Sequence, residues 1–146
     1  MSQKNKSSWE WYAVLLLFES TISGEPNKDK IDENFSDEYK MYEERIVVIR
    51  AQSPDHAYKL ADLGAKKAEM TYKNPYDQTV HCRFVDSLNC QRLFDNEIKS
   101  GTEIYSRLFK ELVNTELESV VNARFPESQY YAEDGKITPY YNFLIN

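Results

Sequence analysis

Residues 13–18 form an unbroken run of six apolar side chains, and this run constrains the fold more than any other feature. It lies inside residues 9–19, which are rich in aromatic and aliphatic residues and contain neither glycine nor proline, as is typical of a β-strand. A strand that is apolar at consecutive positions is expected at the centre of a sheet covered on both faces. A one-sided strand with apolar edges would also produce such a run.

The same run is too short to be an export signal or a membrane span. The apolar core of a signal peptide takes about 7–15 residues, and a membrane-spanning helix takes about 20. Residues 1–8, which precede the strand, are polar and predict a disordered tail. We therefore expect a cytoplasmic protein with no membrane partner.

Residues 42–51 and 54–72 predict a second strand followed by a helix. The strand carries the β-branched run Ile-Val-Val-Ile. The Ser-Pro-Asp sequence at residues 53–55 supplies an N-cap hydroxyl, a proline at the first helical position and an acid in the first turn. Mostly small residues then recur at helical spacing, so the helix should lie close against a sheet until Asn-Pro at residues 74–75 ends it. These residues are Ala57, Leu60, Ala61, Gly64, Ala68 and Tyr72.

The polar stretch before the second strand and the alternating stretch after the helix predict a loop and two more strands. Residues 20–41 read as a long polar loop. In residues 78–85 apolar and polar side chains alternate, which predicts a half-buried strand. Residues 88–94 predict a further strand, joined to the previous one by a turn near residues 86–87.

The C-terminal part predicts a second helix and a hairpin. Residues 101–110 fit either a strand or the start of a helix. An apolar stripe then predicts a helix over about residues 108–124. Two tyrosine-rich runs on either side of an Asp-Gly pair at residues 134–135 predict a hairpin.

The order of these elements predicts an α+β fold. We expect an antiparallel sheet of four to five strands, with helices packed on one face and the C-terminal hairpin as an extension. The chain has 146 residues, which is the usual size of one domain. Residues 9–110 are the predicted core, and residues 111–146 a helix and hairpin extension of the same domain.

The charge of the chain excludes some partners. Its net charge is −6 and its isoelectric point is near 5.0. Duplex nucleic acid is bound mainly by neutralising phosphates with lysine and arginine, so it is not an expected partner. Anionic membrane is disfavoured for the same reason. A basic protein or a small ligand remains open.

Few residues offer metal-binding or nucleophilic chemistry. The histidines are His56 and His81, and the cysteines are Cys82 and Cys90. His81 and Cys82 are adjacent on a predicted strand and point to opposite faces, whereas zinc needs several ligands together. Only a Cys90–His81 pair across a hairpin would place a nucleophile beside a base. The glycines are too far apart for a phosphate-binding loop, so we predict no catalytic residue, no metal and no cofactor.

Aromatic side chains are the main candidates for binding a protein. Trp9 and Trp11 are predicted to share one strand face, opposite Tyr12, where they either fill the core or anchor a partner. Residues 25–44 are acidic on balance and carry further aromatics, which suits a basic protein surface. The Tyr-Tyr pairs of the extension suggest an arm that reaches a second copy, so a homo-oligomer stays open. The candidate partner-binding residues are Trp9, Trp11, Tyr12, Phe35, Tyr39 and Tyr42.

Carboxylates and arginines beside the predicted strands leave a second interpretation open. They could converge on a small ligand, or on a substrate. They could equally form cross-strand ion pairs on a solvated sheet face. The candidate ligand-binding residues in this alternative are Glu19, Glu44, Glu103 and Arg107.

Three stretches of the chain carry a family pattern. They are Trp-Tyr-Ala-Val-Leu-Leu-Leu-Phe-Glu at residues 11–19, Tyr-Glu-Glu-Arg-Ile-Val-Val-Ile at 42–49, and Gly-Thr-Glu-Ile-Tyr-Ser-Arg at 101–107. Together they resemble the bacterial domain-of-unknown-function family numbered four-two-eight-eight, over about residues 9–110. The resemblance implies a strand at residues 101–107 and carries over no activity. The positions it marks are Trp11, Glu19, Glu44, Glu103 and Arg107.

The expected function is non-enzymatic binding of another protein. The acidity, the 14% aromatic content and the missing catalytic set favour a protein that blocks or stabilises a partner by direct contact. Within this class we favour an inhibitor of the immunity or phage anti-defence type, a bacterial setting that only the resemblance implies. A ligand-binding or sequestering protein, or an enzyme using Glu and Arg on the sheet, is the alternative.

Overall fold

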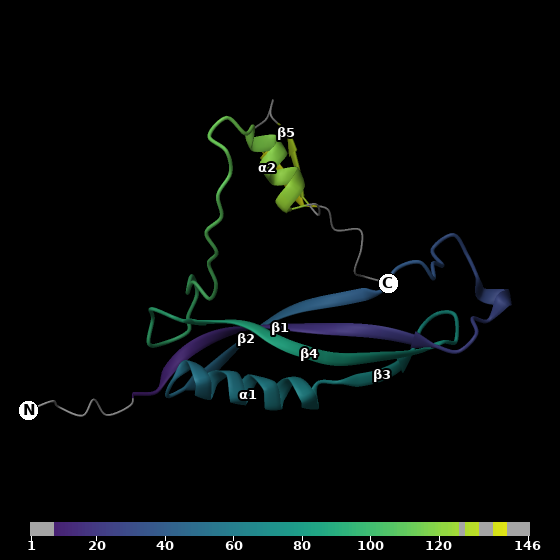
Figure 1. Ribbon diagram of the computed structural model, residues 1–146, viewed down its shortest axis with the longest axis horizontal. Coiled ribbons are helices and arrows are strands. Elements are labelled where there is room, and N and C mark those ends of the chain that lie inside the picture. Colours follow the sequence, from purple (N-terminus) through teal and green to yellow (C-terminus); the bar gives the residue numbers. More distant parts are fainter. Residues whose placement is uncertain (1–7, 126–127, 132–135, 140–146) are drawn as a thin grey trace, which may run out of the picture. The chain divides into compact units, whose positions relative to one another are not determined.

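The computed structural model describes residues 8–125, 128–131 and 136–139 (Figure 1). The chain forms two compact units, Met1–Ser106 and Arg107–Asn146, which we call the N-terminal and the C-terminal unit and describe separately. Their boundary lies close to the one predicted after residue 110. That the two form one domain stays a prediction. All but Ser8 of the predicted tail lies outside the described residues.

The N-terminal unit is built on a four-stranded antiparallel sheet, as the sequence predicts. Its strand order is β2-β1-β4-β3, so the apolar run at residues 13–18 lies in a strand with a neighbour on each side. With the helices described below, this sheet confirms the α+β class. The strands are β1 (Glu10–Ser23), β2 (Met41–Ala51), β3 (Met70–Lys73) and β4 (Thr79–Arg92).

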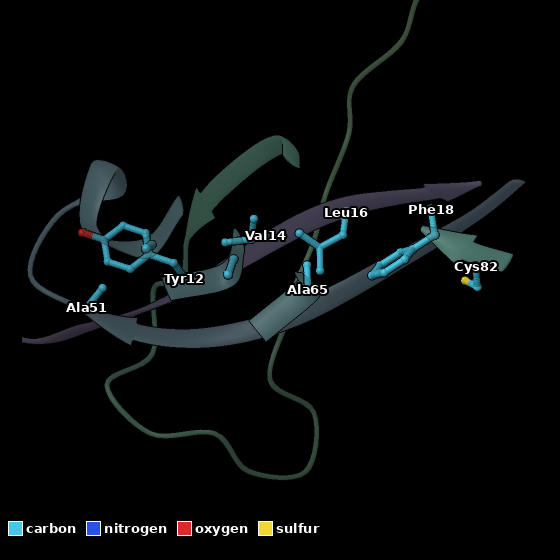
Figure 2. Packing of buried hydrophobic residues seen from close by; sticks show 9 residues of the cluster. Tyr12, Val14, Leu16, Phe18, Ala51, Ala65 and Cys82 are labelled. Atoms are coloured by element: carbon cyan, nitrogen blue, oxygen red, sulfur yellow. The ribbon is translucent and has the colours of Figure 1, made fainter. Parts of the chain in front are cut away.

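One helix, α1 (Pro54–Lys67), packs on one face of the sheet. Ala57, Ala61 and Ala65 are buried on its inner side, and because they are small the helix can lie close to the strands. Facing them, Tyr12, Val14, Leu16 and Phe18 follow one another along β1 (Figure 2). We call this side of the sheet the helix face, and the opposite side the far face.

Helix α1 begins where the sequence predicts it, but it ends earlier than predicted. The Ser53 hydroxyl accepts a hydrogen bond from the His56 amide at 3.1 Å, which confirms the predicted N-cap. The helix ends at Lys67, and the predicted helical stretch to residue 72 is wrong, since Tyr72 lies in β3 opposite Val80 of β4. The backbone pairing of β3 with β4 overrides the helical spacing of these residues.

The structure also corrects two further predictions for this helix: which of its sides faces the sheet, and that Asn-Pro at residues 74–75 ends it. Gly64 and Ala68 are exposed, and the buried alanines include Ala65, so the inner face is rotated by about one residue. Asn74 and the residues after it form the turn between β3 and β4. The Asn74 side-chain oxygen accepts hydrogen bonds from the amides of Tyr76 (3.0 Å) and Gln78 (2.9 Å).

Strand β4 replaces the two short strands predicted at residues 78–85 and 88–94. It pairs with β1 along its length, with register irregularities between Leu15 and Leu16 and between Leu17 and Phe18 of β1. The extra residues opposite these points, Val85 and Leu88, are absorbed as bulges. The turn predicted at residues 86–87 is therefore wrong, because the long partner strand β1 keeps β4 extended.

Residues 93–116 form neither helix nor strand. The strand that the family resemblance implies at residues 101–107 is therefore wrong, and so is the first part of the helix predicted over about residues 108–124. The Gln91 side-chain amide instead holds the main chain of Ser106, with distances of 2.7 and 3.1 Å. Leu108 and Val113 of the apolar stripe are fully exposed, so a helix there would bury no apolar face. No helix in the described part of the chain combines the length and hydrophobicity that crossing a lipid bilayer demands.

The C-terminal unit contains α2 (Leu117–Arg124) and two short paired strands. Strands β5 (Ser128–Tyr131) and β6 (Lys136–Pro139) pair antiparallel, with Ser128 opposite Pro139. The Asp-Gly pair predicted to form their turn and the Tyr-Tyr pair at 140–141 lie outside the described residues. Packing of this second helix on the main sheet stays a prediction.

Candidate functional site

Residues 24–40 connect β1 to β2 and form a long surface loop of the N-terminal unit. Aspartate and glutamate outnumber lysine in this segment, which we call the acidic loop. It begins at Gly24, whose positive φ of 94° suits glycine, and contains one turn of 3-10 helix at Lys28–Lys30. Long loops of this kind are usually either functional or disordered.

The β3–β4 turn anchors the first half of the acidic loop. The Asn27 amide donates to the Tyr76 carbonyl oxygen at 2.8 Å, and the Asn27 side chain donates to the Asp77 carboxylate at 2.8 Å. Lys30 adds an ion pair to the same carboxylate at 3.0 Å. One carboxylate therefore binds two side chains that lie 47 and 50 residues away in sequence.

Tyr76 anchors the middle of the acidic loop. Its hydroxyl donates to the Asp32 carboxylate at 2.7 Å. Its ring packs edge-on against Phe35, with the ring centroids 5.0 Å apart. The same tyrosine therefore provides a polar and an apolar contact to two points of the loop.

Both ends of the acidic loop are also tied to the sheet. The Gln78 side chain, which is only 9% exposed, donates to the Gly24 carbonyl oxygen at 3.0 Å. At the other end, Lys40 forms an ion pair with Glu19 of β1 at 2.8 Å. The loop thus has contacts to the rest of the N-terminal unit at its start, middle and end.

A hollow of about 350 Å³ lies between the acidic loop and the end of β1. Its walls are polar and aromatic, and its rim includes Tyr39, which is 77% exposed. Lys40 lines the hollow, and its ammonium lies 5.4 Å from the ring centre of Tyr42, which is 55% exposed. We call this hollow together with Tyr42 the loop surface. The hollow is lined by Ser20, Thr21, Ile22, Phe35, Ser36, Asp37, Tyr39, Lys40 and Gln78.

The carboxylates that anchor the loop are stabilised in their charged form. The hydrogen bond from Tyr76 lowers the pKa of Asp32, and the same bond raises the pKa of Tyr76. The pKa of Asp77 is lowered by the hydrogen bonds from Asn27 and Lys30. Because the folded pKa values are depressed, these contacts contribute above the ordinary carboxylate pKa and are lost as the pH falls through the folded values.

Replacing Tyr76 with phenylalanine should release the middle of the acidic loop. In Tyr76→Phe the ring contact to Phe35 remains and the hydrogen bond to Asp32 is lost, so the pKa of Asp32 should rise toward its ordinary value. Carboxyl carbon shifts in an NMR titration measure this pKa directly. Tyr72→Phe, on exposed β3, is the matched control and should leave it unchanged. An Asp32 pKa that does not move in Tyr76→Phe contradicts the anchoring.

Three of the predicted partner-binding residues lie at the loop surface. Phe35 lines the hollow with its ring held by Tyr76, and Tyr39 and Tyr42 are exposed beside it. The other three are elsewhere. Tyr12 is 3% exposed in the core, so its assignment as a contact residue is wrong: the alternation of β1 turns it toward α1.

The two tryptophans do not share one strand face as predicted. Trp9 precedes β1 and packs edge-on against His56 of α1, with the ring centroids 5.5 Å apart. Trp11 lies opposite Arg50 of β2 and, by strand alternation from buried Tyr12, belongs to the far face. Trp9 thus contacts α1 while Trp11 belongs to the far face, so the two do not form a single aromatic anchor.

The four candidate ligand-binding residues of the alternative are not brought together. Glu19 is paired with Lys40, and Glu44 lies on the far face opposite Leu17. Glu103 is exposed in the irregular segment of the N-terminal unit, and Arg107 belongs to the C-terminal unit. The charged pairs that form on the sheet fit the cross-strand interpretation better.

The histidines and cysteines are also dispersed. Cys82 is buried in the core, while His81 lies on the other side of β4, 3.2 Å from the Ser23 hydroxyl. Burial raises the pKa of the Cys90 thiol, which disfavours a reactive thiolate. Among the residues that the structure describes, no three His, Cys, Asp or Glu side chains are grouped to hold a metal ion.

The fold and the site together define a class of protein: an α+β domain with an antiparallel sheet, one helix packed on one face of it and an anchored acidic loop. A family model described as Domain of unknown function (DUF4288) matches residues 11–106, so the chain belongs to this family, and the predicted resemblance is confirmed. The match ends where the N-terminal unit ends, at Ser106. No curated protein and no solved structure matches the chain.

Proposed function

We propose that this protein works by binding another protein through the loop surface, without catalysis. The observation that supports this most is the anchoring of the acidic loop, which keeps Tyr39 and Tyr42 exposed while the segments around them are fixed. Tyrosine is enriched among residues that dominate binding energy. A loop already held in one arrangement loses less entropy on binding, so its contacts contribute more to affinity.

The charge of the loop surface indicates what kind of protein it would bind. Asp37 lines the hollow, and Glu33 and Glu38 are exposed on the same loop, in a chain of net charge −6. An acidic surface attracts a basic one and repels an acidic one, which speeds association and selects partners. The partner we propose is therefore a protein with a basic patch.

Within this class we propose an inhibitor of the immunity or phage anti-defence type, acting in the bacterial cytoplasm. Proteins that act on nucleic acid need basic surfaces to bind phosphates. An acidic domain with exposed tyrosines can cover such a surface and block it by contact alone. The family's description assigns no activity, so the inhibitor assignment rests on the charge and the exposed tyrosines of the loop surface, and its bacterial setting rests on the family resemblance alone.

A small-molecule site is the second candidate for the same hollow. Its volume of about 350 Å³ is at the lower end of ligand pockets, which usually bury most of their ligand. Here the walls are themselves open to solvent, since Ile22 is 49% and Tyr39 77% exposed. A hollow of this kind suits one side chain of a protein partner better than a free metabolite.

Replacing the exposed tyrosines tests the proposal. We expect the double variant Tyr39→Ser/Tyr42→Ser to weaken capture of a basic protein partner at low salt by at least about tenfold, since truncating a central tyrosine commonly costs this much. Leu63→Ser is the control, because Leu63 is 59% exposed on α1, away from the loop surface. Raising the salt should also weaken wild-type binding. A partner that the double variant retains and the control loses would refute the loop surface as the binding site.

A further inference from the structure

The outer edge of β2 is a long sheet edge whose backbone groups have no protein partner among the described residues. Along 11 residues β2 pairs on one side with β1, from Met41 opposite Ser20 to Ala51 opposite Glu10. In the described part of the chain, no backbone hydrogen bond joins β2 to any other segment. Every second residue therefore presents its N–H and C=O groups outward. The strand also lacks the proline or bulge that commonly protects an edge, and its only protecting side chains are charged ones.

The far-face side chains of β2 are self-complementary about Val47. Glu44 and Arg50 lie three positions to either side of it, and both belong to the far face, opposite Leu17 and Trp11 of β1. Neither charge takes part in an ion pair among the described residues.

Between these two charges, the far face of β2 is apolar. Ile46 and Val48 stand one position to either side of Val47, and they are 40% and 38% exposed. Ile46 lies beside half-buried Leu15, so the apolar strip continues from the edge into the sheet.

We propose that the outer edge of β2 pairs antiparallel with β2 of a second copy of this chain, about a twofold axis at Val47. In this register Glu44 of each copy lies opposite Arg50 of the other, and Ile46 lies opposite Val48. The two sheets then join into one continuous sheet of twice the width. The proposal does not depend on the proposed function, because it is argued from the backbone edge and from the side chains around Val47. Tyr42 of the loop surface lies near the start of the same strand.

Other registers of the same edge lose this complementarity. An axis at Arg45 would place the two Arg45 side chains opposite each other, and like charges facing across strands are destabilising. An axis at Ile46 or Val48 leaves Arg50 without an acid opposite it. Parallel pairing of the same edge would turn one sheet over, so the far faces would point to opposite sides and Glu44 could not meet Arg50. A register shifted by a single residue would bring the far face of one copy beside the helix face of the other.

The side chains of β2 on the helix face are also compatible with the proposed register. Val47 lies opposite Val47 of the second copy, and Arg45 lies opposite Ile49. The Arg45 charge is already compensated within its own chain, by Glu43 at 2.7 Å. Its guanidinium also lies 4.0 Å from the centre of the Phe18 ring. No uncompensated charge is therefore buried at the junction.

A charge swap tests both the dimer and its register. Sedimentation velocity on the full chain should show dimers that form as the concentration rises. E44R and R50E should each weaken dimerisation by about tenfold or more, because like charges then face each other twice. The double variant E44R/R50E should restore it, because opposite charges face each other again. Circular dichroism checks that all variants are folded.

Hydrogen exchange identifies the edge that is used. Amides of β2 should exchange more slowly as the concentration of the wild-type chain rises, and those of β3 at the other edge should not change. A chain that stays monomeric at all concentrations overturns the proposal, as does a dimer that both single variants keep or the double variant fails to restore. Protection of β2 only when a different protein is bound would overturn self-pairing in favour of a foreign strand.

Discussion

Phe18→Ala should lower the free energy of unfolding of the N-terminal unit by about 3–5 kcal/mol, the usual cost of removing a buried phenylalanine. Phe18 is 1% exposed and is one of the two largest fully buried side chains. Its ring packs 5.7 Å from the Phe84 ring, and the Arg45 guanidinium covers it at 4.0 Å (Figure 2 shows its place at the end of the core). The variant therefore leaves a cavity beneath a charged group. Urea unfolding followed by circular dichroism measures the loss.

Phe94→Ala is the matched control for this prediction. Phe94 is 90% exposed just beyond β4, so the same chemical change should alter the unfolding free energy by no more than about 0.5 kcal/mol. If Phe18→Ala destabilises the protein no more than Phe94→Ala does, the packing of Phe18 against Phe84 and Arg45 is not as described. Should Phe18→Ala fail to fold at all, Phe18→Leu provides a smaller loss at the same position.

Ala61→Leu should lower the unfolding free energy by about 1–3 kcal/mol, and more if α1 cannot shift. Ala61 is 1% exposed at the middle of the contact between α1 and the sheet. Three extra carbon atoms there have no space unless the helix moves away from β1. The same denaturation experiment measures this effect, and it should appear without loss of helical signal in the native baseline.

Gly64→Ala, on the same helix, should raise the free energy of unfolding instead of lowering it. A Cβ at Gly64 meets no atom within 4 Å, and the position is exposed. Alanine should therefore stabilise the protein by about 0.5–1 kcal/mol, because glycine is the poorer helix former. If Gly64→Ala destabilised the protein, Gly64 would face the sheet as the sequence spacing predicts, and the orientation of α1 in the structure would be contradicted.

The elements that the sequence predicts well are those with a local cause. The apolar run of β1, the β-branched run of β2 and the Ser53 cap of α1 each depend on residues that are adjacent in sequence. Strand β3 has no such signal. Its four residues are all exposed, Tyr72 continues the helical spacing of α1, and only pairing with β4 makes the segment a strand.

The sequence indicates which residues make up the loop surface, but not the contacts that hold the acidic loop in place. The aromatic and acidic pattern around Phe35 and Tyr39 marks the segment as a binding candidate. Its anchors, Tyr76 and Asp77, lie in a turn that carries only an Asn-Pro turn signal. They reach Asp32 and Asn27 across 44 and 50 residues, and no local pattern reports a contact of that range. Tyr12 was misassigned because strand alternation alone does not say which face a helix will cover.

The most direct test of the account is native mass spectrometry, at low salt, of the full chain recovered from bacterial cytoplasm. We predict a complex of this chain with a basic protein in fixed stoichiometry, present with the wild type and with Leu63→Ser, and lost with Tyr39→Ser/Tyr42→Ser. A homodimer without any other protein would leave the β2 proposal standing and contradict the proposed function. A chain that carries only a small molecule, displaced by the tyrosine substitutions, would show that the hollow binds a ligand instead of a protein.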